Sequence, residues 1–154
     1  NQQQDHSAQS QIKLQVMMQY IHTNYSSQIA LSDIAQSAGI SKSSALSFFH
    51  KYLKMAPVSY LILYRLKKAS ELLITTDLKL VEIAYATGFN NIGYFCKQYK
   101  FHYGITPTEY RKLKAQGNKN LFSNIENRKL MYTREGKNLI MAIYLSLTIW
   151  ESSN

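Results

Sequence analysis

The sequence predicts an all-α protein built from two helix–turn–helix units that are joined by a long helix. Three observations support this fold class. The chain repeats itself once, its apolar residues recur at helical spacing, and Gly and Pro stand where helices would end and begin. The first copy of the repeat starts at Leu31 and the second at Leu80, 49 residues later.

Each copy of the repeat contains the parts of a helix–turn–helix. The first copy has Leu31, Ile34, Ala35, Gly39, Ile40, Phe48, Phe49 and Pro57. The second copy has Leu80, Ile83, Ala84, Gly88 and Phe89 in the same order, then the aromatic residues Phe95 and Tyr99, and then Pro107. The small Ala suits a close crossing of two helices, and the Gly suits the turn between them. The offset grows from 49 to 50 residues after the Gly, so the second turn is one residue longer.

The segment before the repeat divides into a polar start and one helix. Residues 1–11 are rich in Gln and Ser and predict a linker or disordered segment. From residue 12 to residue 25 the apolar residues follow a helical stripe, formed by Ile12, Val16, Met17, Tyr20 and Ile21.

The first unit is expected over about residues 31–53. Ser32 would cap a helix over 33–38, which Gly39 would end. Ser41 would cap the next helix, over about 41–53. Pro57 suits the first turn of a long linker helix to about Thr75. Its expected buried side consists of Leu61, Ile62, Leu66, Ala69, Leu72 and Leu73.

The second unit is expected over about residues 80–103. After a turn at 75–77, Asn90 or Asn91 would cap its second helix, over about 91–103, and Gly104 would end it. Thr106, Pro107 and Glu109 predict a capped helix start, so that the domain spans residues 12–115.

The remaining residues, 116–154, form a C-terminal extension of open structure. Its apolar stretch at 138–150 is too short to span a bilayer. Two short strands or one helix are both compatible with this segment.

The charge of the chain indicates a polyanionic partner. The sequence has 18 Lys+Arg against 9 Asp+Glu, a formal net charge of +9. Twelve of these cations and only four acids fall within residues 41–115, so the excess lies on the repeat. A single Cys96 excludes an internal disulfide and favours a reducing, cytoplasmic setting. The polar start shows no signal peptide, and the Asn at position 1 suggests a fragment of a longer chain.

An enzyme is not expected. The four His residues lack metal-ligand spacing, and the sequence has no Gly-rich phosphate loop, nucleophile elbow or paired carboxylates. No cofactor or metal is predicted.

The predicted reading surface consists of the outer faces of the helices at 41–53 and 91–103. A helical wheel places Ala45, Phe48, Phe49 and Tyr52 inward, with Ser43, Ser47 and His50 opposite them. In the second copy Phe95, Tyr99 and His102 take the inward positions. The corresponding outward positions of the second copy are occupied by Gly93, Lys97 and Lys100. Small and cationic side chains on such a face suit a major groove. The candidate DNA contacts are Lys42, Ser43, Ser44, Leu46, Ser47, His50, Lys51, Asn91, Ile92, Gly93, Lys97 and Lys100, and Lys97 is the strongest of them.

The same residues resemble a known family. The run Leu31-Ser-Asp-Ile-Ala with Gly39, then Arg65-Leu-Lys-Lys-Ala69, is similar to the DNA-binding domain of AraC/XylS-type bacterial transcription regulators. The second half matches best, from Ile83-Ala-Tyr-Ala-Thr-Gly88-Phe89 through Tyr94-Phe95-Cys-Lys97 to Gly104-Ile-Thr-Pro107.

The resemblance implies two homeodomain-like three-helical units whose recognition helices enter successive major-groove segments of double-stranded DNA. It also implies a regulator of transcription, an activator that contacts RNA polymerase, with an upstream effector-binding or dimerisation domain. The chain departs from the family at Ser47, where Arg is common, and at Lys54, where Gly commonly ends the helix. The first unit is therefore expected to read bases weakly. The competing interpretation is a basic helical module that binds RNA or a protein.

Overall fold

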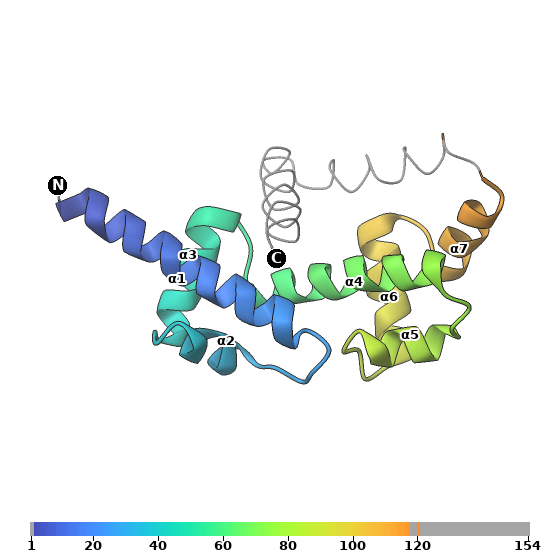
Figure 1. Cartoon of the computed structure of the whole chain (residues 1–154), viewed down its shortest axis with the longest axis horizontal. Helices are drawn as coiled ribbons and strands as arrows, with labels where there is room; N and C mark the ends of the chain where they lie inside the picture. The colour runs from blue at the N-terminus through green and yellow to red at the C-terminus, as the bar shows by residue number, and fades with distance from the viewer. Residues whose placement is uncertain (1, 118–119, 121–154) are drawn as a thin grey trace.

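The computed structural model describes residues 2–117 and residue 120. Within these residues it contains seven α-helices and no β-strand, which confirms the predicted fold class (Figure 1). The helices are α1 (Gln2–Asn24), α2 (Leu31–Ser37), α3 (Lys42–Leu53), α4 (Pro57–Thr75), α5 (Leu80–Ala86), α6 (Ile92–Tyr103) and α7 (Pro107–Ala115). The prediction for the apolar stretch at 138–150 lies outside the described residues.

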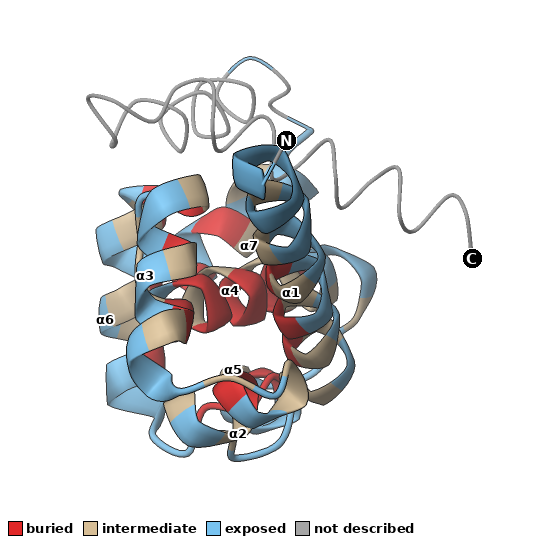
Figure 2. Ribbon diagram, turned by 90° about the vertical axis from the view of Figure 1, so that its left-hand side faces the viewer, coloured by how far each residue is buried: buried red, intermediate tan, exposed pale blue. Residues whose placement is uncertain are grey.

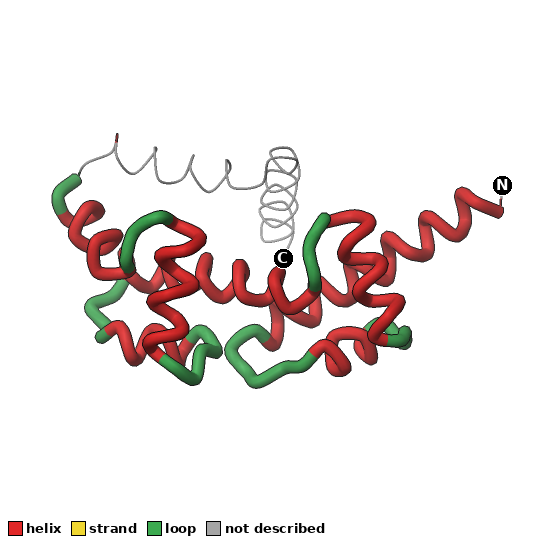
Figure 3. Tube along the Cα trace, turned by 180° about the vertical axis from the view of Figure 1, so that it is seen from behind, coloured by secondary structure: helices red, strands yellow, loops and turns green. Residues whose placement is uncertain are grey.

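Helix α4 runs along the long axis of the molecule and joins two helical units. Helices α1–α3 gather at one end of α4 and α5–α7 at the other, an arrangement that Figure 3 shows from behind. The N-terminal half of α4 places Tyr60, Leu61 and Tyr64 in the core of the first unit. Its C-terminal half places Leu66, Ala69 and Leu73 in the core of the second. One helix therefore belongs to both cores, as expected for a stiff linker.

The internal repeat is a repeat of structure. Ala35 and Ala84, the small residues expected at the close helix crossings, are 2% and 1% exposed. The buried residues of α3 are Ala45, Phe49 and Leu53, and those of α6 are Phe95, Tyr99 and Tyr103. Each of the second three lies 50 residues after its counterpart, so the two helices bury the same face.

The helix starts were predicted correctly in three of the repeated elements and wrongly in one. Ser41 caps α3, Asn91 caps α6 and Thr106 caps α7, each by accepting a backbone N–H. Ser32 does not cap α2, because that helix begins one residue earlier, at Leu31. The N–H of Ala30 instead donates to the carboxylate of Asp33 at 2.7 Å.

The prediction for the N-terminal segment was wrong, because α1 begins at Gln2 and residues 2–11 are helical. Gln is a good helix former, and a helix that is already packed farther along can extend cheaply by one residue at a time. The start of α1 also touches α3, where the Tyr52 hydroxyl donates to the Ser7 carbonyl at 3.5 Å.

The buried face of α1 matches the predicted stripe only in part. Met17 and Ile21 are buried as predicted, together with Leu14, whereas Ile12 is 59% exposed and Val16 36% exposed. The sequence contains two apolar faces on this helix, and only contact with α2 and α3 decides which of them is covered.

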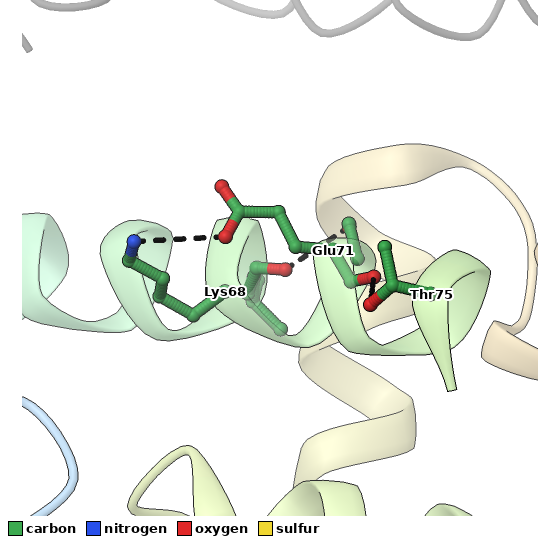
Figure 4. Close-up of polar contacts among 5 residues, drawn as sticks. Lys68, Glu71 and Thr75 are labelled. Atoms are coloured by element: carbon green, nitrogen blue, oxygen red, sulfur yellow. Dashed lines mark hydrogen bonds and ion pairs between the residues drawn. The ribbon is translucent and has the colours of Figure 1, made fainter. Parts of the chain in front are cut away.

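In the last turn of α4, a side chain of the helix bonds to a backbone carbonyl of the same helix. The Thr75 hydroxyl donates to the carbonyl of Glu71 at 2.7 Å, and the Glu71 carboxylate lies 3.6 Å from the ammonium of Lys68 (Figure 4). An exposed ion pair of this spacing contributes a few tenths of a kcal/mol. None of the helices in the described part of the chain is long and apolar enough to cross a bilayer.

Candidate nucleic-acid interface

The candidate interface consists of the outer faces of α3 and α6. Each helix packs its buried face against the core of its own unit, and this packing turns the opposite face to solvent. Figure 2 shows α3 in front of α6 on the same side of the molecule, both with exposed surface outward. The two predicted reading helices are thus presented together by α4.

Eleven of the twelve predicted contact residues have exposed side chains or, for glycine, an exposed backbone. On α3 these are Lys42, Ser43, Leu46, Ser47, His50 and Lys51. At the start of α6 and along it they are Asn91, Ile92, Gly93, Lys97 and Lys100. The exception, Ser44, is half-buried, and its hydroxyl accepts a hydrogen bond from Ser41 at 3.0 Å.

Two of these residues also hold the helix starts in place. The backbone N–H of Ser44 donates to the Ser41 hydroxyl oxygen at 3.1 Å. The side-chain oxygen of Asn91 accepts the N–H of Tyr94 at 2.8 Å. Ser44 and Asn91 therefore belong to the N-terminal caps of the two reading helices, a structural role that the sequence indicated for Asn91 and not for Ser44.

The charge of the interface comes from lysine. Lys97 and Lys100 are exposed on α6, and the ammonium of Lys51 on α3 lies 5.1 Å from the ring centroid of Tyr52. His102 is half-buried, and burial lowers the pKa of its imidazole. Burial also raises the pKa of the Cys96 thiol. Both groups are consequently neutral at pH 7, so neither adds charge to α6.

Sequence reasoning missed two exposed aromatic residues beside the reading face of α6. Tyr94 is 45% exposed and Phe101 is 61% exposed. Their seven-residue spacing places both on one flank of the helix, and this spacing is the signal that could have identified them. At the corresponding positions α3 has Ser44 and Lys51, so the two helices differ in the chemistry of this flank.

No group of three or more His, Cys, Asp or Glu side chains in the described part of the chain could hold a metal ion.

Comparison with known proteins gives the same picture. A family model described as a helix-turn-helix domain matches residues 34–113. The lactose operon transcription activator of Staphylococcus xylosus is 34% identical over 98 residues, which are 64% of this chain and 35% of that protein. The crystal structure of a transcriptional regulator from Chromobacterium violaceum, described as AraC-type DNA-binding domain-containing, is 34% identical with a TM-score of 0.66. That match covers 71% of this chain and 97% of the other.

A third comparison concerns the fold alone. The DNA-binding domain of AdpA, solved in complex with a target DNA, is 24% identical with a TM-score of 0.64. The match covers 67% of this chain and 94% of the AdpA domain. By contrast, the chain spans only about a third of the length of the curated regulators that it matches.

Proposed function

Because the chain belongs to the family of AraC-type helix–turn–helix DNA-binding domains, we propose that α3 and α6 enter successive major-groove segments of one operator. The observation that supports this proposal most strongly is the placement of both reading helices on one side of α4 (Figure 2). A duplex lying along that side meets both exposed faces together.

The two helices differ in what they offer to a base pair. Lys97 on α6 is an exposed donor that suits a guanine edge or a neighbouring phosphate. The corresponding residue of α3 is Ser47, which has a shorter reach and no charge. Sequence specificity therefore rests mainly on α6, while α3 contributes phosphate contacts through Lys42 and Lys51 and responds to DNA shape.

At the level of the whole protein, we propose a transcription regulator that acts in the cytoplasm. The S. xylosus relative is named a transcription activator, which supports activation of transcription here. Contact with RNA polymerase is part of the same proposal. The additional length of the relatives leaves room for an effector-binding or dimerisation domain outside this chain.

Selection of random duplexes by the purified chain tests the proposal. Recovery of a bipartite motif with half-sites about one helical turn apart is the expected result. Competition with single-stranded RNA distinguishes duplex reading from the basic RNA-binding alternative. Enrichment of no duplex sequence, or stronger binding to the RNA, would refute the proposal.

Lys97→Ala tests the assignment of the main contact. We expect it to weaken binding to the selected duplex by roughly 1–3 kcal/mol. Lys112→Ala is the matched control, because Lys112 is an exposed lysine on α7, outside both reading helices, and its loss changes the net charge equally. Equal affinities of the two variants in an electrophoretic shift assay would contradict the role of Lys97.

A further inference from the structure

The two units touch each other directly, midway along α4. Tyr64 lies in the first core and Leu66 in the second, and Arg65 stands between them with only 9% of its surface exposed. A guanidinium at such a position needs hydrogen-bond partners within the protein, since water reaches little of it. Its hydrogen-bond partners belong to the first unit, and an aromatic ring of the second unit lies beside the guanidinium.

Arg65 holds the loop between α1 and α2. Its Nε donates to the carbonyl of Tyr25 at 2.7 Å, and its Nη2 donates to the carbonyl of Ser27 at 2.8 Å. The centre of the same guanidinium lies 5.9 Å from the ring centroid of Phe89, which follows the turn after α5. One side chain of α4 therefore contacts a loop of each unit.

A second connection joins the two loops without α4. The side-chain amide of Gln28 donates to the backbone carbonyl of Gly88 at 3.0 Å. In Figure 1 the loop after α1 approaches the turn after α5 beside the middle of α4. We name the group Tyr25, Ser27, Gln28, Arg65, Gly88 and Phe89 the inter-unit joint.

The repeat shows that Gly88 serves the joint as well as its own turn. Gly39, the corresponding residue of the first unit, has φ +64° and no atom within 4 Å of where a Cβ would lie. Gly88 has φ +92°, and a Cβ there would overlap the Tyr25 carbonyl oxygen and lie 2.6 Å from Arg65 Nε. Gly39 and Gly88 both adopt the left-handed conformation, but only Gly88 is in close contact with the other unit.

We propose that the inter-unit joint makes α3 and α6 a single rigid reader and so sets the spacing between half-sites that the protein accepts. A helix alone bends and twists about its axis. Bonds beside that axis, between the loops, oppose such motion because they would have to stretch. This inference rests on the proposed function for its DNA consequence, whereas the rigidity itself is a property of the free protein.

Spin-label distances test the rigidity without DNA. With Cys96→Ser as background, labels are attached through Gln36→Cys on α2 and Ala86→Cys on α5, which are exposed positions outside the reading faces. Double electron–electron resonance should give one narrow distance distribution for the parent. Gln28→Ala and Arg65→Gln should widen or shift that distribution.

A matched pair of glycine variants separates the joint from turn strain. Gly88→Ala should also widen the distribution, whereas Gly39→Ala should leave it unchanged even if both lower the melting temperature. Gln28→Ala keeps the test decisive if Gly88→Ala does not fold, because the Gln28 side chain is exposed. A distribution as narrow as the parent's in folded Gln28→Ala and Arg65→Gln would overturn the proposal.

The DNA consequence is tested on the selected duplex with two base pairs inserted between its half-sites. The insertion displaces one half-site by about 7 Å and rotates it by about 70°. The parent should lose about tenfold or more in affinity, and Gln28→Ala should lose clearly less. If the parent bound the duplex with and without the insertion equally well, the inference would be overturned, although DNA binding itself would stand. Failure of the parent to select any duplex would refute the proposed function, and the label distances would still decide on rigidity.

Discussion

Lys54 ends α3 in a conformation that favours glycine, and Lys54→Gly should therefore stabilise the protein. Its backbone has φ 54° and ψ 27°, and its N–H donates to the His50 carbonyl at 3.1 Å. Gly104 occupies the same position after α6, with φ 76° and an N–H that donates to the Lys100 carbonyl at 2.8 Å. A left-handed conformation costs an ordinary residue about 1–2 kcal/mol. The extra freedom of Gly in the unfolded chain offsets roughly 0.5–1 kcal/mol of the gain.

The lysine charge has to be separated from the backbone effect. An ammonium near a helix C-terminus contributes about 0.3–1 kcal/mol at low salt, and both Lys54→Gly and Lys54→Ala remove it. Lys54→Ala keeps the unfavourable conformation, so the Gly variant should exceed the Ala variant by about 1 kcal/mol in free energy of unfolding. Conversely, Gly104→Ala should destabilise by about 1 kcal/mol, because open space around Gly104 leaves only the backbone cost.

Urea unfolding followed by helical circular dichroism measures these differences. The comparison is made at moderate salt, where the contribution of the lysine charge is reduced. If Lys54→Gly were no more stable than Lys54→Ala, the left-handed backbone of residue 54 would not be a source of strain.

Three further predictions concern buried and half-buried polar groups. Burial lowers the pKa of His102 below its usual 6.5, so the unfolded chain binds more protons and stability should fall as pH drops through 6.5. In His102→Gln the free energy of unfolding should depend less on pH around 6.5. An unchanged pH dependence would count against the role of His102. Ser70→Ala removes a 2.9 Å hydrogen bond to the Tyr99 hydroxyl and should lower the free energy of unfolding by roughly 1–3 kcal/mol. In a chain that already carries Tyr99→Phe, the same substitution should lower it by less, because the bond is already absent. Burial raises the pKa of Cys96, so iodoacetamide should modify it more slowly in the folded protein than in urea, and equal rates would argue against this assignment.

The local structure of the repeat could be predicted closely from the sequence. Ser41, Asn91 and Thr106 begin their helices as expected, and α4 spans Pro57 to Thr75 as expected. Caps, prolines and apolar spacing act over a few residues, so they can be recognised without knowledge of the rest of the chain. The family assignment has the same basis, because it depends on an ordered run of such signals.

The start of α1 shows where this reasoning ends. Composition predicted a linker over residues 1–11, but the chain continues the helix back to Gln2. The buried residues of α1 include Met17 and Ile21, as predicted, but Leu14 in place of the predicted Ile12. Both errors have one cause. Whether a polar turn stays helical, and which of two apolar faces is covered, depends on neighbouring helices and not on the segment itself.

The sequence by itself determined the helices of the repeat, their order and the outward positions of residues such as Ser47 and Lys97, because each depends on near neighbours. Only the tertiary structure decided that α3 and α6 share one side of the molecule (Figure 2). It also decided that Arg65 bonds to a loop 40 residues away and that Gln28 meets Gly88 across 60 residues. Such contacts follow from how two cores pack on one helix, and no local pattern encodes them.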